Sequence, residues 1–244
     1  MSSTGPNKAR VDHATMDSVV GAAKTAFQSR RLRYVKMDEA NEDIKAFMPE
    51  VEGDPVTQCL ANPSLFRPQG KKEIDYSTEQ FAKSFLGVAI CLHPDEETKQ
   101  AGGSATSSTT SSTAATDSHS SGRKASKTGT IIGTMCLGWG GIPAATAHHR
   151  NAQLGIVLAD AYQGRGYGRE AINWMLDWAF RHGGLHTVSL VTYSFNERGV
   201  HLYSDIGFQL EGRRRQVAWF DRKWYDELWF GMTEDEWEKL RGLR

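Results

Sequence analysis

The sequence has few cysteines, no charge imbalance and no long apolar run. Its 244 residues include only 3 Cys. Cys59, Cys91 and Cys136 are far apart and form neither a C-x-x-C pair nor a disulfide framework, which indicates a reducing compartment. The 29 Lys and Arg balance the 29 Asp and Glu, so the composition argues against nucleic acid or an anionic membrane as the main partner.

No stretch approaches the roughly 18 uninterrupted apolar residues of a membrane span. The N-terminus lacks the apolar run and cleavage site of a secretory signal, and Asp12 and Asp17 argue against a mitochondrial presequence. We therefore expect a soluble, cytoplasmic protein, with the nucleus as the alternative location.

Two parts of the chain lack the large apolar residues that a core needs. Residues 101–128 are mostly Ser, Thr, Gly and Ala, and with the polar flank before them we predict a disordered insertion over 93–128. An N-terminal extension, 1–28, has apolar residues at helical spacing, which predict a short amphipathic helix for packing or a dimer contact: Met16, Val19, Val20, Ala23 and Phe27. The rest, about 180 residues, is the size of one domain, which we place at 29–240.

The remaining sequence alternates between strand-like and helix-like segments. Strands are predicted over 31–37, 86–92, 130–139, 153–159 and 186–195, with the second and third joined as a hairpin that the insertion lengthens. Helices are predicted from Asp38 to a stop at Pro49, from a cap at Ser77 or Thr78 to Phe85, from Ala171 to Gly183, and from a cap at Asn196 to Gly207. The closing stretch predicts two strands around a turn at 221–223 and a short helix capped at Thr233. This order is typical of a mixed α/β fold.

A buried strand, the turn QGRGYG and a helix follow one another at 153–179. Glycines let the backbone approach a ligand, successive amides point into the turn, and a helix N-terminus adds roughly half a positive charge, so this segment is suited to hold a phosphate. Arg165 and Arg169 would add charge-assisted contacts. The spacing G-x-G-x-G differs from the Rossmann fingerprint, and the G-K-[ST] of a P-loop is absent. Taken alone, the segment also fits a tight turn without a ligand.

The pattern Q-x-x-G-x-G at Gln163, Gly166 and Gly168 resembles the acetyl-CoA signature of the GCN5-related N-acetyltransferase (GNAT) superfamily. The stretch NERGVHLYSDIGF resembles that superfamily's N-x-x-A-x-x-x-Y-x-x-x-G-F helix, with Gly199 in place of the usual Ala and with four matching residues: Asn196, Tyr203, Gly207 and Phe208. The likeness covers most of 31–237 in element order. The closing stretch EGRRRQVAWFDRKWYDELWFGMTEDEW resembles the branch that contains ribosomal-protein alanine and small-amine acetyltransferases.

The resemblance implies a GNAT fold: a mixed, mostly antiparallel central sheet of about six to seven strands, with splayed fourth and fifth strands and flanking helices. It implies acetyl-CoA as cosubstrate and direct transfer to a primary amine, without a metal. The pantetheine arm would pair with the backbone of Ile156, Val157 and Leu158, and an N–H of Leu158 or a neighbour would stabilise the oxyanion. The pyrophosphate would lie on the turn formed by Gln163, Gly164, Arg165, Gly166, Tyr167, Gly168 and Arg169.

The same resemblance assigns catalytic roles to two residues. Tyr203 would protonate the leaving thiolate, and Asn196 would position the pantetheine; a packed tyrosine and a helix N-cap are the alternatives. The base is left open between a water chain and four carboxylates that spacing does not separate: Glu211, Asp221, Asp226 and Glu227. The neighbouring His148 and His149 point apart and lack a third ligand, so no metal site is expected.

Aromatic and acidic residues alternate in the closing stretch, which in this family borders the acceptor pocket or the dimer contact. We predict substrate binding by Trp219, Asp221, Trp224, Asp226 and Glu227. Aromatic faces with carboxylates suit a cationic amine that has an apolar face. The balanced charge favours an amino sugar such as glucosamine over a polyamine. A protein N-terminal or lysine acetyltransferase and a non-catalytic acyl-CoA-binding module are the alternatives, and a homodimer is expected.

Overall fold

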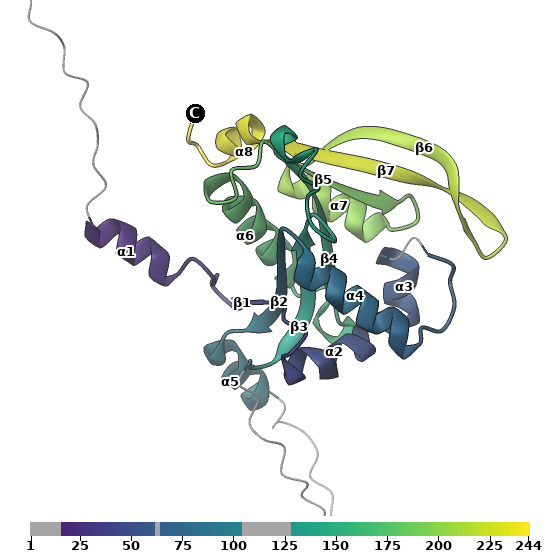
Figure 1. Cartoon of the computed structure of the whole chain (residues 1–244), viewed down its shortest axis with the longest axis horizontal. Coiled ribbons are helices and arrows are strands. Elements are labelled where there is room, and N and C mark those ends of the chain that lie inside the picture. Colours follow the sequence, from purple (N-terminus) through teal and green to yellow (C-terminus); the bar gives the residue numbers. More distant parts are fainter. Residues whose placement is uncertain (1–15, 62–63, 104–127) are drawn as a thin grey trace, which may run out of the picture.

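The computed structural model describes residues 16–61, 64–103 and 128–244, and its elements form one mixed sheet with helices on both faces (Figure 1). The strand order is β1-β2-β3-β4-β5-β7-β6. The strands are β1 Leu32–Lys36, β2 Leu86–Leu92, β3 Ile131–Leu137, β4 Asn151–Leu158, β5 Thr187–Tyr193, β6 Gln209–Phe220 and β7 Lys223–Thr233. All neighbours are antiparallel except β4 and β5, which are parallel. This is the mixed, mostly antiparallel sheet that the sequence predicts.

Helices before and after the middle of the chain cover opposite faces of the sheet. The helices are α1 Met16–Lys24, α2 Glu42–Glu52, α3 Pro55–Ala61, α4 Lys71–Lys83, α5 Pro94–Gly103, α6 Tyr167–Arg181, α7 Glu197–Ile206 and α8 Glu234–Leu240. The α2 and α4 helices pack on one face, and α6 and α7 pack on the other. Within the described residues, no helix is both long and apolar enough to span a membrane.

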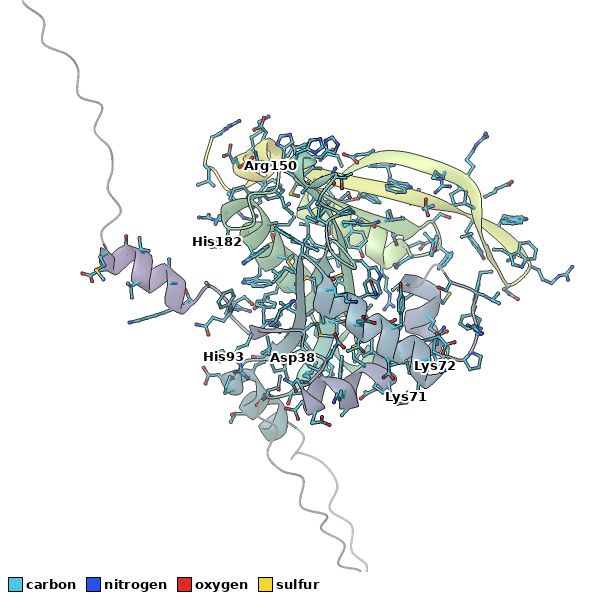
Figure 2. All side chains as sticks on the ribbon, in the orientation of Figure 1. Asp38, Lys71, Lys72, His93, Arg150 and His182 are labelled. Atoms are coloured by element: carbon cyan, nitrogen blue, oxygen red, sulfur yellow. The ribbon has the colours of Figure 1, made fainter. Side chains whose placement is uncertain are left out.

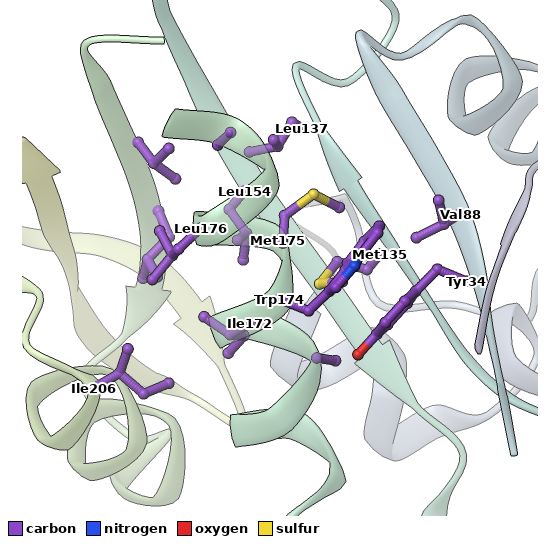
Figure 3. Packing of buried hydrophobic residues seen from close by; sticks show 14 of the residues in the cluster. Tyr34, Val88, Met135, Leu137, Leu154, Ile172, Trp174, Met175, Leu176 and Ile206 are labelled. Carbon is purple, nitrogen blue, oxygen red and sulfur yellow. The ribbon is translucent and has the colours of Figure 1, made fainter. Parts of the chain in front are cut away.

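The largest core lies between the sheet and α6 (Figure 3). The predicted apolar face of α6 is fully buried there, with Ala171, Ile172, Met175, Leu176 and Ala179 each no more than 1% exposed. The Trp174 ring stacks on Tyr34 of β1 with 3.6 Å between centroids. Its Nε1 donates to the Ala26 carbonyl at 2.9 Å. This packing fixes α6 against the sheet.

The β4 and β5 strands pair at one end only. Their register runs from Asn151↔Thr187 to Gln153↔Ser189, although β4 continues to Leu158 and β5 to Tyr193. Ala159 N–H donates to Ile132 O, and Gly138 N–H donates to Gln153 O, so odd-numbered residues of β4 hydrogen-bond to β3. Because antiparallel pairing alternates, the backbone groups of Ile156 and Leu158 point the other way, into the gap. The predicted splay is therefore confirmed.

Two predicted helix boundaries are wrong. The α2 helix continues through Pro49 to Glu52, although proline removes one hydrogen bond from a helix interior. Buried Met48 and Val51 on either side of the proline give the packing that stabilises the last turn. The α4 helix begins after Gly70, not at Ser77 or Thr78. The Gly70 N–H donates to Glu73 Oε2 at 3.1 Å, and Thr78 Oγ1 donates to the Ile74 carbonyl at 2.8 Å inside the helix.

The C-terminal elements agree closely with the prediction. Asn196 caps α7, and Thr233 caps α8 by accepting the Glu236 N–H at 3.3 Å. The β6–β7 turn lies at Asp221 and Arg222, whose φ values of 45° and 59° are typical of a tight two-residue hairpin turn.

The insertion and the extension differ in part from their predicted states. Pro94–Gly103, inside the predicted disordered segment, forms α5. Thr128, the last residue of that segment, is buried, and its N–H donates to Asp43 Oδ2 at 3.2 Å. The predicted helix in the extension is present as α1, but it contains no buried residue, and Phe27 lies beyond its end. Residues 1–15 and 104–127 lie outside the described residues.

Candidate active site

The predicted phosphate turn lies where the splay opens, directly before α6. Gly164 and Gly166 have φ values of 70° and 80°, in the left-handed region that disfavours side chains, and Gly166 is the N-cap of α6. A Cβ at Gly168 would lie 3.6 Å from both Leu158 Cδ1 of β4 and Leu202 Cδ2 of α7. The turn thus brings the first amides of α6, the splayed edge of β4 and α7 together, which is an arrangement suited to an anionic ligand.

Gln163 ties the edge of β4 to α7. Its Nε2 donates to the Leu158 carbonyl at 3.0 Å, and its Oε1 accepts from Arg198 Nη2 at 3.2 Å. Arg198 is a basic residue that the sequence reasoning did not single out, because 35 positions separate it from Gln163 and only the packing of α7 brings it to the turn.

The three predicted side chains around the glycines have different surroundings. Arg165 is exposed, with its Cζ 5.9 Å from the centroid of the Tyr162 ring. Arg169 pairs with Asp205 of α7 at 3.0 Å. Tyr167 is only 2% exposed, and its hydroxyl lies 3.1 Å from Glu96 Oε1. The Tyr167 side chain therefore belongs to the core, and only its backbone N–H is placed to face a ligand.

The α7 helix carries both predicted catalytic residues. Tyr203 is partly buried, and its ring lies 6.3 Å from Phe208 and 6.2 Å from Phe230, between centroids. Burial raises the pKa of Tyr203 above its ordinary value, so the hydroxyl is protonated at neutral pH. In the described part of the chain this hydroxyl has no hydrogen-bond partner. A protonated hydroxyl is the state that the predicted role of proton donor requires.

Asn196 has the geometry of a helix cap. Its Oδ1 accepts the Gly199 N–H at 3.0 Å, and its Nδ2 donates to Thr192 Oγ1 at 3.2 Å. A Cβ at Gly199 would lie 2.7 to 3.0 Å from the Asn196 carboxamide, which explains glycine where alanine is usual. The cap interpretation thus accounts for both groups of the carboxamide, and the role toward pantetheine stays a prediction.

On the opposite face of the sheet, Tyr193 and Glu227 lie side by side at the end of the splay. They are register partners on β5 and β7. Burial raises the pKa of Tyr193, and the nearby Glu227 and Cys59 of α3 raise it further. Glu227 Oε1 accepts from Arg214 Nη1 at 2.9 Å and from Trp229 Nε1 at 2.7 Å. Its other oxygen, Oε2, has no hydrogen-bond partner among the residues that the structure describes.

Glu227 is the one candidate base that the structure places at the splay. Asp226 points to the other face of β7, where a hydrogen bond from the Gln216 N–H and the pair with Arg213 hold its pKa below the ordinary range. Asp221 lies in the exposed hairpin turn. Glu211 lies against Gly231 at the far end of the hairpin. The sequence analysis did not identify Tyr193 and Cys59, because a single tyrosine or cysteine does not indicate a site until the fold brings it next to other site residues.

The predicted tryptophans lie at the tip of the β6–β7 hairpin. Trp219 and Trp224 are register partners with 5.0 Å between ring centroids, and they are 57% and 56% exposed. Below them, four rings form an aromatic bridge between the hairpin and the body: Phe66, Phe195, Phe220 and Tyr225. The structure therefore separates the predicted acceptor residues into three places: the exposed hairpin tip, Asp226 on the other face of β7, and Glu227 at the splay.

The opposite end of the β4–β5 pair is closed. Arg150, which precedes β4, lies at the α8 end of the molecule, and His93 lies at the other end beside α5 (Figure 2). The His186 N–H donates to the Arg150 carbonyl, and Arg150 Nε donates to the Gly184 carbonyl, both at 2.6 Å. These bonds hold β4 and β5 together at one end, so that the strands diverge toward α6 and α3.

Comparisons with known proteins agree with this geometry. A family model described as the acetyltransferase (GNAT) family matches residues 91–208. The SPbeta prophage-derived uncharacterized N-acetyltransferase YokL of Bacillus subtilis is 33% identical over 95 residues, which are 38% of this chain and 54% of that protein. The spermidine N(1)-acetyltransferase of Vibrio cholerae is 35% identical over 78 residues, 32% of this chain and 45% of that protein. The chain thus spans about half the length of these curated relatives.

The fold likeness extends over more of the chain. The crystal structure of spermidine N-acetyltransferase from Vibrio cholerae in complex with CoA and spermine has a TM-score of 0.61 and covers 86% of this chain and 99% of that one, at 15% sequence identity. A splayed parallel strand pair beside a glycine turn and a helix N-terminus is the arrangement of the GNAT fold, which this structure has. Within this chain, residues 91–208 match the GNAT family.

Proposed function

We propose that the protein is an acetyl-CoA-dependent N-acetyltransferase that transfers the acetyl group directly to a primary amine. The observation that carries this proposal is the splay of β4 and β5, which turns the backbone of Ile156 and Leu158 into a gap beside the α6 N-terminus. An extended pantetheine arm would pair with these groups, and the pyrophosphate would accept from the amides of 165–169. The described residues thus offer hydrogen-bond donors for both the pantetheine arm and the pyrophosphate.

The residues around the gap suit each step of the transfer. The amine nitrogen attacks the thioester carbon, a C–N bond forms, and a backbone N–H of β4, at Leu158 or a neighbour, stabilises the oxyanion. When the C–S bond breaks, the Tyr203 hydroxyl gives its proton to the thiolate. The proton lost by the amine goes to Glu227, directly or through water. Asn196 would support the pantetheine from the α7 cap.

We propose a polyamine such as spermidine as the acceptor. The amino sugar favoured by the charge balance finds less support, because relatives of this chain in Vibrio cholerae and Escherichia coli are named spermidine N(1)-acetyltransferases. Glu227 Oε2 and the Tyr193 hydroxyl would accept hydrogen bonds from a protonated amine beside the splay. The cytoplasmic location and the homodimer stay predictions.

The activity is tested by following free thiol with acetyl-CoA and a panel of acceptors: spermidine, spermine, glucosamine and peptides with free N-termini. We expect thiol release to be fastest with spermidine or spermine. Faster release with glucosamine or with peptides would contradict the polyamine proposal. Acetyl-CoA binding without thiol release for any amine would contradict the enzymatic activity and favour an acyl-CoA-binding module.

The acceptor side is tested by Glu227→Gln, with Glu42→Gln as a matched control on the exposed side of α2. We expect the glutamine at 227 to raise the KM for the polyamine or lower kcat by about tenfold or more, because one charge-assisted contact or the proton acceptor is lost. The affinity for acetyl-CoA should stay the same in both variants. Equal kinetics in the two variants would remove Glu227 from the acceptor side.

A further inference from the structure

The phosphate turn has a second basic neighbour that comes from the other end of the domain. Arg31 directly precedes β1, yet its Nη1 donates to the Arg165 carbonyl at 3.1 Å. Its Nη2 lies 3.4 Å from the position of a Cβ at Gly166, the N-cap of α6. The guanidinium therefore lies at the N-terminus of α6, where the amides of the turn begin.

Glu170, in the first turn of α6, fixes this side chain. Its two oxygens accept from the Arg31 backbone N–H and from Arg31 Nε, each at 2.7 Å. Ser29 Oγ donates to the same carboxylate at 2.7 Å. Burial opposes ionisation of Glu170, but the hydrogen bonds from Arg31 and Ser29 outweigh it and hold the pKa below its ordinary value. The carboxylate is therefore charged at neutral pH and forms a salt bridge with Arg31.

The Tyr167 ring supports the guanidinium from one side, with 4.4 Å between Arg31 Cζ and the ring centroid. The Arg31 side chain is thus held by contacts at Nε, at Nη1 and at one face of the guanidinium. The remaining nitrogen, Nη2, makes no hydrogen bond to the described residues and is not among their buried unpaired side-chain atoms, so it is open to solvent. A guanidinium held in this way loses little further freedom when it binds an anion.

We propose that Arg31 is a binding residue for acetyl-CoA that presents Nη2 to a phosphate oxygen at the α6 turn. The inference rests on the proposed acetyl-CoA site. It makes Arg31, rather than Arg165 or Arg169, the main basic side chain for phosphate binding at that site. Arg169 forms an ion pair with Asp205, and Arg165 is exposed with only a distant contact to a tyrosine ring. Arg31, in contrast, is held in place before a ligand binds. Arg31 thereby links the start of β1 to the cofactor turn.

Calorimetric titration of the full chain with acetyl-CoA tests this role. We expect Arg31→Gln to weaken acetyl-CoA binding by about tenfold or more, as befits one hydrogen bond between charged groups. Arg31→Lys keeps the charge but lacks the fork that reaches Glu170 and the turn together, so its loss should be intermediate. The matched control is Arg222→Gln in the hairpin turn, which should bind as the wild type does.

S-acetyl-pantetheine, which has the thioester but no pyrophosphate, separates a phosphate contact from a structural role. Titrations followed by ligand-observed NMR should show equal affinity for the wild type and Arg31→Gln. If the affinities for both ligands and the melting temperature all fall together in Arg31→Gln, Arg31 only stabilises the fold, and the proposal is overturned. It is also overturned if acetyl-CoA binding is unchanged. Because these readouts are binding constants, an absence of turnover with every amine would contradict the proposed activity alone.

Discussion

At the scale of single residues, the two sides of the gap differ in the groups they offer: a tyrosine hydroxyl on one side and a carboxyl group on the other. Burial keeps Tyr203 protonated on the α7 side, and the Glu227 carboxyl group lies on the α3 side, where Oε1 accepts two hydrogen bonds. Attack by a neutral amine needs a proton acceptor on the side from which the amine comes, and the leaving thiolate needs a donor on the other. In the proposed transfer, the placement of Glu227 and Tyr203 on opposite faces of the sheet would meet both needs.

Tyr203→Phe removes the donor but keeps the ring that packs between Phe208 and Phe230. We expect kcat to fall by about a hundredfold, since general acids typically contribute that much or more. The affinity for acetyl-CoA and the melting temperature should hardly change, because the hydroxyl has no partner in the described residues. Titration and thermal unfolding alongside the kinetics check this. A large loss of affinity or of folded protein would instead indicate a packing role.

Glu170 gives the fold a dependence on acid that can be measured. Its folded-state pKa is depressed, so its contribution to the free energy of unfolding is present above its unfolded pKa and is lost as the pH falls through the folded value. At pH 7 we expect Glu170→Gln to lower the free energy of unfolding by about 2 kcal/mol, because charged hydrogen bonds to Arg31 and Ser29 are lost. Urea unfolding should show this difference shrinking below pH 4. A difference that stays constant with pH would mean that the charge is not involved.

At the scale of elements, sequence patterns predicted those whose signals are local. The apolar face of α6, the Asn196 cap of α7 and the β6–β7 turn all appear where the sequence places them. The prediction failed where tertiary packing outweighs a local signal, as at Pro49 inside α2. It failed at α4 because a glycine, capped through the later Glu73, carries a weaker signal than Ser77 or Thr78.

The site follows the same division. The turn at 163–168 and the positions of Asn196 and Tyr203 could be predicted from motifs, since each motif lies within one strand–turn–helix unit. Arg31, Tyr193 and Cys59 could not be, because the contacts that bring them to the site join elements far apart in the chain. The sequence also could not separate Asp226 from Glu227, because the direction of the alternation along β7 is set by its partner strand.

The turn itself is testable as a strand–turn–helix element. Gly166 has a φ of 80°, whereas Gly168 lies inside α6, where a Cβ would make contacts of 3.6 Å. We expect Gly166→Ala to lower the free energy of unfolding by about 1 to 2 kcal/mol and to weaken acetyl-CoA binding, because alanine disfavours the left-handed region. Gly168→Ala should fold with nearly unchanged stability. Chemical unfolding and titration of both variants make the comparison; equal stabilities would show that the turn relaxes freely.

At the scale of the whole molecule, the long hairpin and the α3–α4 connection meet over the splayed end of the sheet. Phe66 packs edge-on against Phe220 with 5.4 Å between centroids, and Phe195 lies 6.2 Å from Phe220 and 4.9 Å from Tyr225. The strand pairing of the hairpin with β5 ends at Tyr193, and Ser194 adds two hydrogen bonds to Asp226, so beyond this point the bridge is a further contact between the hairpin and the body (Figure 1). The bridge therefore lies next to the proposed acceptor side.

Phe220→Ala should free the outer hairpin without unfolding the domain, because the lost contacts lie outside the main core. We expect cleavage by trypsin at Arg222 or Lys223 to become several-fold faster and the KM for the acceptor to rise, while acetyl-CoA affinity stays unchanged, because opening of a local segment is governed by its own few contacts. Trp219→Ala removes a neighbouring exposed ring that is not part of the bridge and serves as the control. If both variants are cleaved at the wild-type rate, the hairpin is held by its strand pairing alone, and the bridge does not couple it to the acceptor side.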